Sequence, residues 1–123
     1  MKRLIPFMVL FVFSLFATGA FSAEPVPSYI HFVVVDSVLP DGSDSRDAVL
    51  AFEKEVIKLA GGFTEIGATR GGALEGDAVV PQKNISFMIS ADRDISRELK
   101  TLTTQLFGGR GGFILAWQGT MLY

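Results

Sequence analysis

Apolar residues recur at helical spacing in two parts of the chain, the first of which runs from Ser45 to Gly62. Its apolar positions fall every three or four residues, as on one face of an α-helix: Val49, Phe52, Val56 and Leu59. Asp44 or Ser45 precedes them as an N-cap, and Gly61 follows them as a helix end. The pattern predicts one amphipathic helix.

The second helical pattern is ADRDISRELKTLTTQLFGG, residues 91–109. Its apolar stripe consists of Ile95, Leu99, Leu102 and Leu106. Asp92 or Asp94 is the expected N-cap, and Gly108 is the expected end. A second helix with one buried face is therefore predicted.

Four further segments read as β-strands. Residues 28–38 and 63–69 are rich in β-branched and aromatic side chains. In residues 83–90 apolar and polar side chains alternate, which predicts a half-buried strand. The last segment, residues 112–123, has Phe113, Leu115 and Trp117 on one face. Between the second and third strands, the glycine-rich residues 70–82 predict a hairpin connection or an exposed flap.

The order β-α-β-β-α-β predicts an α+β domain of the ferredoxin-like plait type, with a four-stranded antiparallel sheet and both helices on one face. The other face is expected to display some of the following mostly apolar or small residues: His31, Val33, Val35, Ile66, Ser86, Met88, Ile114 and Ala116. So apolar a face is seldom left in water. We expect it to pack against a second copy or to hold a ligand.

The same order, with AGGFTEIGATRGG after the first helix and NISFMISADRD before the second, resembles plait-type dimeric α/β-barrel domains. It is also similar to small uncharacterised exported bacterial proteins whose first helix runs into a GG-hydrophobic-T strand. The resemblance implies a homodimer formed through the sheet. It also implies an aromatic residue and a glutamate near the central hairpin, where this chain has Gly71 or Gly72 and Val80 or Gln82. No site residue is carried over.

The first 22 residues have the layout of a secretory signal peptide: Lys2 and Arg3, then an apolar core, then small residues before Glu24. Cleavage after Ala20 or Ser22 is expected to leave one domain over residues 23–123. The alternative is a retained anchor, but the apolar run is shorter than the roughly 20 residues of a spanning helix. The expected location is a periplasm or the exterior, with no membrane span after signal removal.

Charge and cysteine content exclude several partners. Without Lys2 and Arg3, 9 of the 11 basic residues remain against 13 acidic ones, a net charge near −4. This balance gives no electrostatic reason to bind nucleic acid. The chain has no cysteine, so it carries neither disulfides nor thiol chemistry. No nucleotide-binding or hydrolase motif is present, and we expect no cofactor.

Two groups of side chains are candidates for chemistry. His31 is the only histidine, and with Asp36 it is a candidate for proton transfer, although a packed sheet histidine is the commoner role. Asp41, Asp44 and Asp47 offer oxygen ligands of the kind calcium prefers, but without EF-hand spacing. A turn and a helix cap explain these acidic residues better than a calcium site does.

Two arginines stand beside glycine pairs, in TRGG and in FGGRGGF. Arg70 and Arg110 are candidates for binding an anion, since successive backbone N–H groups in such turns can form a nest. The glycines also suit the end of a helix and a chain reversal. Trp117 is a third candidate for ligand contact, because exposed aromatic residues are enriched in binding surfaces.

These observations favour an exported non-enzymatic module that forms a homodimer through its sheet and binds an envelope protein or a small anionic ligand. The alternative is an enzyme of the dimeric α/β-barrel kind that uses His31 or a nearby carboxylate.

Overall fold

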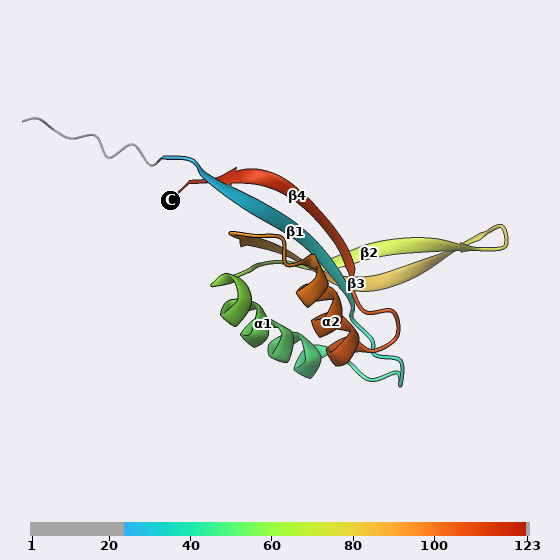
Figure 1. The fold of residues 1–123 in the computed structure, drawn as a ribbon. Helices are drawn as coiled ribbons and strands as arrows, with labels where there is room; N and C mark the ends of the chain where they lie inside the picture. The colour runs from blue at the N-terminus through green and yellow to red at the C-terminus, as the bar shows by residue number, and fades with distance from the viewer. Residues whose placement is uncertain (1–23, 123) are drawn as a thin grey trace, which may run out of the picture.

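The computed structural model describes residues 24–122, and the predicted signal peptide lies outside this range. Two helices cover one face of a four-stranded antiparallel sheet (Figure 1). The elements are β1 (Val26–Asp36), α1 (Arg46–Ala60), β2 (Thr64–Glu75), β3 (Ala78–Ala91), α2 (Ser96–Phe107) and β4 (Phe113–Met121). The sheet order is β2-β3-β1-β4, with both outer strands antiparallel to their neighbours. The predicted ferredoxin-like plait is confirmed.

The core lies between the helices and the inward side chains of β1 and β3. Three aromatic rings form its centre: the ring centroids of Phe52 and Phe87 are 5.1 Å apart, and that of Phe107 is 6.1 Å from Phe52. Edge-on or tilted contacts at such distances are favourable for aromatic pairs. From α1 the core takes Val49, Phe52 and Val56, as the sequence pattern predicts, whereas Leu59, the fourth predicted position, is 36% exposed.

The buried stripe of α2 differs from the predicted one. Ile95 and Leu99 are buried as expected, and Leu102 and Leu106 pack partly buried against the core, but the fully buried positions further along α2 are Thr103 and Phe107. The hydroxyl of Thr103 donates to the carbonyl of Lys100 at 3.1 Å, so this threonine is satisfied without solvent. A hydrophobic pattern does not identify a buried threonine, because its hydroxyl is satisfied by a hydrogen bond within the helix.

The glycine-rich segment 70–82 forms the expected hairpin connection, but as paired strand and not as a flap. It forms the outer parts of β2 and β3, which stay paired from Arg70–Lys83 to Glu75–Ala78 around a two-residue turn at Gly76 and Asp77. These residues are called the arm, and they project beyond the helices (Figure 1). Leu74 and Val79 on the arm are 71% and 68% exposed. A bulge between Glu65 and Gly67 lies where β2 is still part of the body, and Ile66 is the extra residue.

The FGGRGGF segment closes the connection from α2 to β4. Gly108 follows α2, and Gly111 has a φ of 68° and lies so close to α2 that an added Cβ would stand 2.9 Å from the backbone nitrogen of Thr104. Any side chain at Gly111 would therefore be strained and obstructed. The prediction that these glycines end the helix and turn the chain fits this geometry.

Candidate functional site

The face of the sheet opposite the helices is the main candidate site. On this open face β4 places three large side chains in a row, and they remain substantially exposed: Phe113 at 59%, Leu115 at 49% and Trp117 at 44%. The strand register sets Ile30, Phe32 and Val34 of β1 beside them. Met88 of β3, which is 41% exposed, lies opposite Phe32. The centre of the open face is therefore apolar and uncharged.

The predicted composition of this face is partly wrong. Val33 and Val35 are buried in the core instead, and the register places His31, Ile114 and Ala116 on the same covered side. Ser86 and Met88 do lie on the open face, as expected. A strand such as β1, which is apolar on both sides, has no alternation to show which side chains face the helices.

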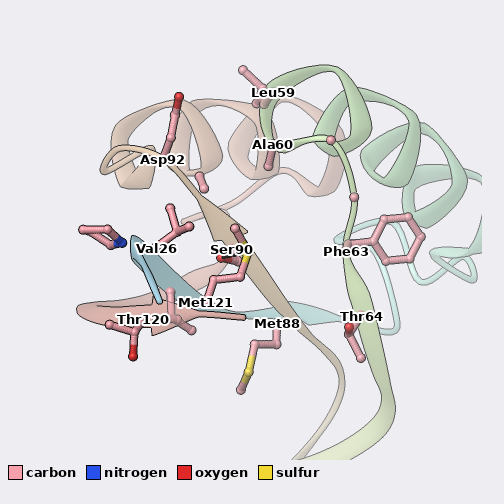
Figure 2. A pocket seen from close by; sticks show the side chains of 15 residues that line it. Val26, Leu59, Ala60, Phe63, Thr64, Met88, Ser90, Asp92, Thr120 and Met121 are labelled. Atoms are coloured by element: carbon pink, nitrogen blue, oxygen red, sulfur yellow. Dashed lines mark hydrogen bonds between the residues drawn. The ribbon is translucent and has the colours of Figure 1, made fainter. Parts of the chain in front are cut away.

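An apolar pocket lies at the end of the open face where the termini of the described chain meet. It exists because β2 begins only at Thr64, so the last residues of β3 have no strand on that side. Its volume is about 820 Å³. Figure 2 shows the end of α1 with Leu59 and Ala60 on one side, and Met88, Ser90 and Met121 on the other. The hydroxyl of Ser90 lies 3.5 Å from the sulfur of Met121.

A second, polar pocket lies at the opposite end of the open face, where the arm leaves the body of the sheet. Its volume is about 500 Å³. Its polar lining residues are Asp36, Thr69, Arg70, Gln82, Asn84 and Ser86, and its apolar walls include Phe32, Val34 and Phe113. The open face thus has an apolar end, an apolar centre and a polar end.

His31 is sealed into the covered side of the sheet with no exposed surface. Its Nδ1 lies 3.3 Å from the carbonyl oxygen of Ile89, and its Nε2 accepts the backbone N–H of Ile95 at 3.1 Å. These contacts suit a ring with its proton on Nδ1. They give the histidine a structural task, since it accepts an N–H group at the start of α2 that would otherwise lack a partner.

A carboxylate also lies beside His31, but it is Asp94 and not Asp36. Asp94 Oδ1 is 3.3 Å from Nε2, and it also accepts the backbone N–H and the hydroxyl of Ser96. The hydrogen bond from the Ser96 hydroxyl is the main reason that the pKa of Asp94 lies below its ordinary value, and the backbone N–H of Ser96 lowers it further. Asp36 faces the opposite side of the sheet, so it shares no site with His31.

The acidic turn before α1 forms its own local contacts. Asp41 accepts the hydroxyl and backbone N–H of Ser43, and these bonds lower its pKa. Asp44 accepts the N–H of Arg46, and Asp47 lies in the first turn of α1. Within residues 24–122 no three side chains of the metal-ligating acidic, histidine or cysteine types come together.

The two arginine-glycine segments have different surroundings. Arg70 borders the polar pocket, although strand alternation directs its Cβ away from the face that carries Thr69 and Gly71. Around Arg110, the N–H of Gly111 already donates to the carbonyl of Gly108 at 3.0 Å. The ammonium of Lys100 donates to the carbonyls of Arg110 and, at 2.9 Å, of Gly112. Part of the backbone expected to form an anion nest is thus used within the turn.

The polar pocket is the part of the site that sequence reasoning missed. Ser86, Met88 and Ser90 were recognised as one side of an alternating strand. The same two-residue period continues backward through Asn84 and Gln82, and this extension was the available signal. This signal is masked because the glycine-rich residues 70–82 favour a hairpin connection or a flap.

Comparisons with known proteins support the fold and go no further. No protein-family model matches the chain, and no curated protein matches it. Among solved structures, the chain is similar to the divalent cation tolerance protein CutA1 of Thermus thermophilus, with a TM-score of 0.56 and 13% sequence identity. The likeness covers 73% of this chain and 82% of that protein. The chain therefore shares with CutA1 the ferredoxin-like α+β fold.

Proposed function

We propose that this chain is an exported, non-enzymatic module that forms a homodimer through the open face and binds a partner protein or a small ligand at the same face. The observation that carries the proposal is the exposed row of Phe113, Leu115 and Trp117 on β4. Fully burying one such side chain contributes about 1.5–3 kcal/mol. Contiguous apolar surface of this kind marks interaction sites.

A second copy suits this face for two reasons. The residues that β1, β3 and β4 contribute to its centre carry no charge, so two copies meet without burying an unpaired ion. Two sheets also pack face to face at about 10 Å, and a two-fold axis presents the same surface to both partners. The ends of the open face, with their two pockets, then provide room for a ligand or a partner protein.

The non-enzymatic part of the proposal rests on His31. Acid–base catalysis needs a side chain that reaches the substrate, and this ring is fully buried with both nitrogens in contact with protein atoms. It lines neither the apolar nor the polar pocket. The enzyme alternative therefore lacks its best candidate residue.

Export is the part of the proposal that rests on residues 1–22 alone. Among the described helices none is long and apolar enough to cross a membrane. Expression of the full chain in a bacterium, followed by fractionation and intact-mass measurement, tests the proposal. A periplasmic or secreted product that begins near Phe21 or Ala23 is expected, whereas a cytosolic product with its first residues intact contradicts it.

Sedimentation equilibrium of residues 23–123 tests the homodimer. We expect a dimer at micromolar concentrations for the wild type and a monomer for Leu115→Glu, which places a charge at the centre of the open face. Leu50→Glu is the matched control, because Leu50 is 50% exposed, as Leu115 is at 49%, but lies on α1. A wild type that stays monomeric at high concentration, or a control that dissociates equally, contradicts the proposal.

A further inference from the structure

The polar pocket contains a nearly buried amide side chain that faces its open space. Asn84 is only 8% exposed, and its carboxamide lines the pocket without a hydrogen bond to another group of residues 24–122. Its polar atoms are not sealed from the pocket, since the fully buried side-chain oxygen without a partner in this range is that of Ser45. The carboxamide is therefore available to what occupies the pocket, water or a bound molecule.

Strand register arranges further polar groups around Asn84. Asp36 of β1 and Thr69 of β2 are its direct neighbours on either side, so three polar side chains form one row across the sheet. The hydroxyls of Thr69 and Ser86 lie 2.6 Å apart and hold each other in place. Gln82 is two residues before Asn84 and faces the same way.

Gly71 keeps the row accessible. It pairs with Gln82, and a Cβ added to it would stand 3.0 Å from Nδ2 of Asn84 and 3.6 Å from Oε1 of Gln82. A side chain at this position would therefore fill the space between the two carboxamides. The absence of one leaves both amide groups open to a small molecule.

We propose that the polar pocket binds a neutral, hydroxyl-rich ligand the size of a monosaccharide. The inference rests on the proposed function, because it names the small ligand of that binding face. Carboxamides and hydroxyls both donate and accept hydrogen bonds, as the hydroxyls of a sugar do. Phe32 and Phe113 supply apolar walls for the apolar side of a sugar ring. The volume of about 500 Å³ falls within the usual range for small-molecule sites.

Charged ligands suit the pocket less well. The carboxylate of Asp36 disfavours an anion, and the Cβ of Arg70 leaves the strand on the other face. A fully apolar ligand would displace water from the carboxamide of Asn84 without replacing its hydrogen bonds, which is costly for a nearly buried group. A hydroxyl-rich ligand satisfies the polar row and uses the apolar walls as well.

Titration of ¹⁵N-labelled residues 23–123 with D-glucose, D-galactose and D-mannose, followed by NMR, tests the inference. At least one sugar should shift the side-chain amide signal of Asn84 saturably, with a Kd of about 10 mM or tighter. Gly71→Ala and Asn84→Ala should each weaken binding at least tenfold. Gly62→Ala, where an added Cβ meets nothing within 4 Å, should bind as the wild type does.

Each other outcome overturns the inference. One is that none of the three sugars shifts the Asn84 signal saturably. Another is that sodium phosphate shifts it and the sugars do not. A third is that Gly62→Ala weakens sugar binding as much as Gly71→Ala does. The same titration on Leu115→Glu separates this inference from the homodimer, because the polar pocket lies within one subunit. If the wild type dimerises and binds no sugar, only the ligand assignment fails.

Discussion

The two faces of the sheet use alternate residues of the same strands and have opposite surroundings. On the covered face, Val33, Phe87 and Ile89 have no exposed surface. On the open face, Leu115 and Trp117 are as apolar but nearly half exposed. The covered face explains why the chain folds, whereas the open face needs a further explanation. The difference teaches that this domain holds more apolar surface than its own two helices cover.

The largest effect is expected from truncation of the covered face. Phe87→Ala should lower the free energy of unfolding by about 3–5 kcal/mol, because it opens a cavity among packed aromatic rings. Urea denaturation in the Leu115→Glu background removes any contribution from the homodimer. In that background Leu50→Ala on the exposed side of α1 should cost less than about 1 kcal/mol. Equal losses of unfolding free energy in the two variants would contradict the assignment of Phe87 to the core and of Leu50 to the surface.

A smaller loss is expected at His31. The change His31→Leu keeps an apolar body in the core but leaves the N–H of Ile95 and the carbonyl of Ile89 without their partner. About 2 kcal/mol of stability should be lost, the typical cost of an unsatisfied buried group. Denaturant unfolding measures the loss, and sedimentation of the same variant should still show a dimer. An unchanged stability would mean that the histidine is not the partner of the α2 terminus.

The pH dependence of stability is expected to carry a contribution from Asp94. Because the folded pKa of Asp94 lies below its ordinary value of 3.8, chiefly through the Ser96 hydroxyl, its contribution is present above that value. It is lost as the pH falls through the folded pKa. Asp94→Asn lacks this titration, so the difference in free energy of unfolding between it and the wild type should become smaller from pH 5 to about pH 2. The difference between Ser96→Ala and the wild type should become smaller over the same range. A difference that does not change with pH would contradict the assignment to Asp94.

The smallest effect is expected at Ser45. Its hydroxyl is buried and, within the described part of the chain, has no hydrogen-bond partner. The carboxylate of Asp44 accepts the backbone N–H of Arg46 instead. Ser45 therefore does not cap α1 through its side chain. Ser45→Ala should therefore change stability by no more than about 0.5 kcal/mol, or raise it. A loss of about 1–2 kcal/mol, typical of a true N-cap, would contradict this contact pattern.

Most of the fold was predictable because the hydrophobic periodicity of each segment agrees with the turn and capping residues at its ends. The stripe of α1 with Gly61 at its end, and the alternation of Ile85, Phe87 and Ile89, each point to one element and one buried side. The strand pairing of the arm is not predicted, because glycine and proline in residues 70–82 have low strand propensity. Cross-strand pairing from Arg70–Lys83 to Glu75–Ala78 holds these residues extended all the same.

The candidate site was predictable only in outline. An uncovered apolar face follows from the element order and from having only two helices, and Trp117 does lie on it. Which residues of β1 face outward depends on contacts made by residues far apart in sequence, so a continuous apolar run does not reveal it. The polar pocket depends on the register that sets Asp36, Asn84 and Thr69 side by side. Arg70 and Arg110 stay predictions as anion-binding residues.

The most direct test of the central claim uses Trp117, the single tryptophan of the chain, which lies on the open face itself. Its fluorescence emission is measured while residues 23–123 are diluted from high to low concentration. If two copies cover this face, the emission should move to longer wavelength on dilution, with the midpoint at the dimer dissociation constant from sedimentation. Leu115→Glu should show the long-wavelength emission at every concentration. A wild-type emission that is constant across the dilution and equal to that of Leu115→Glu would contradict the account.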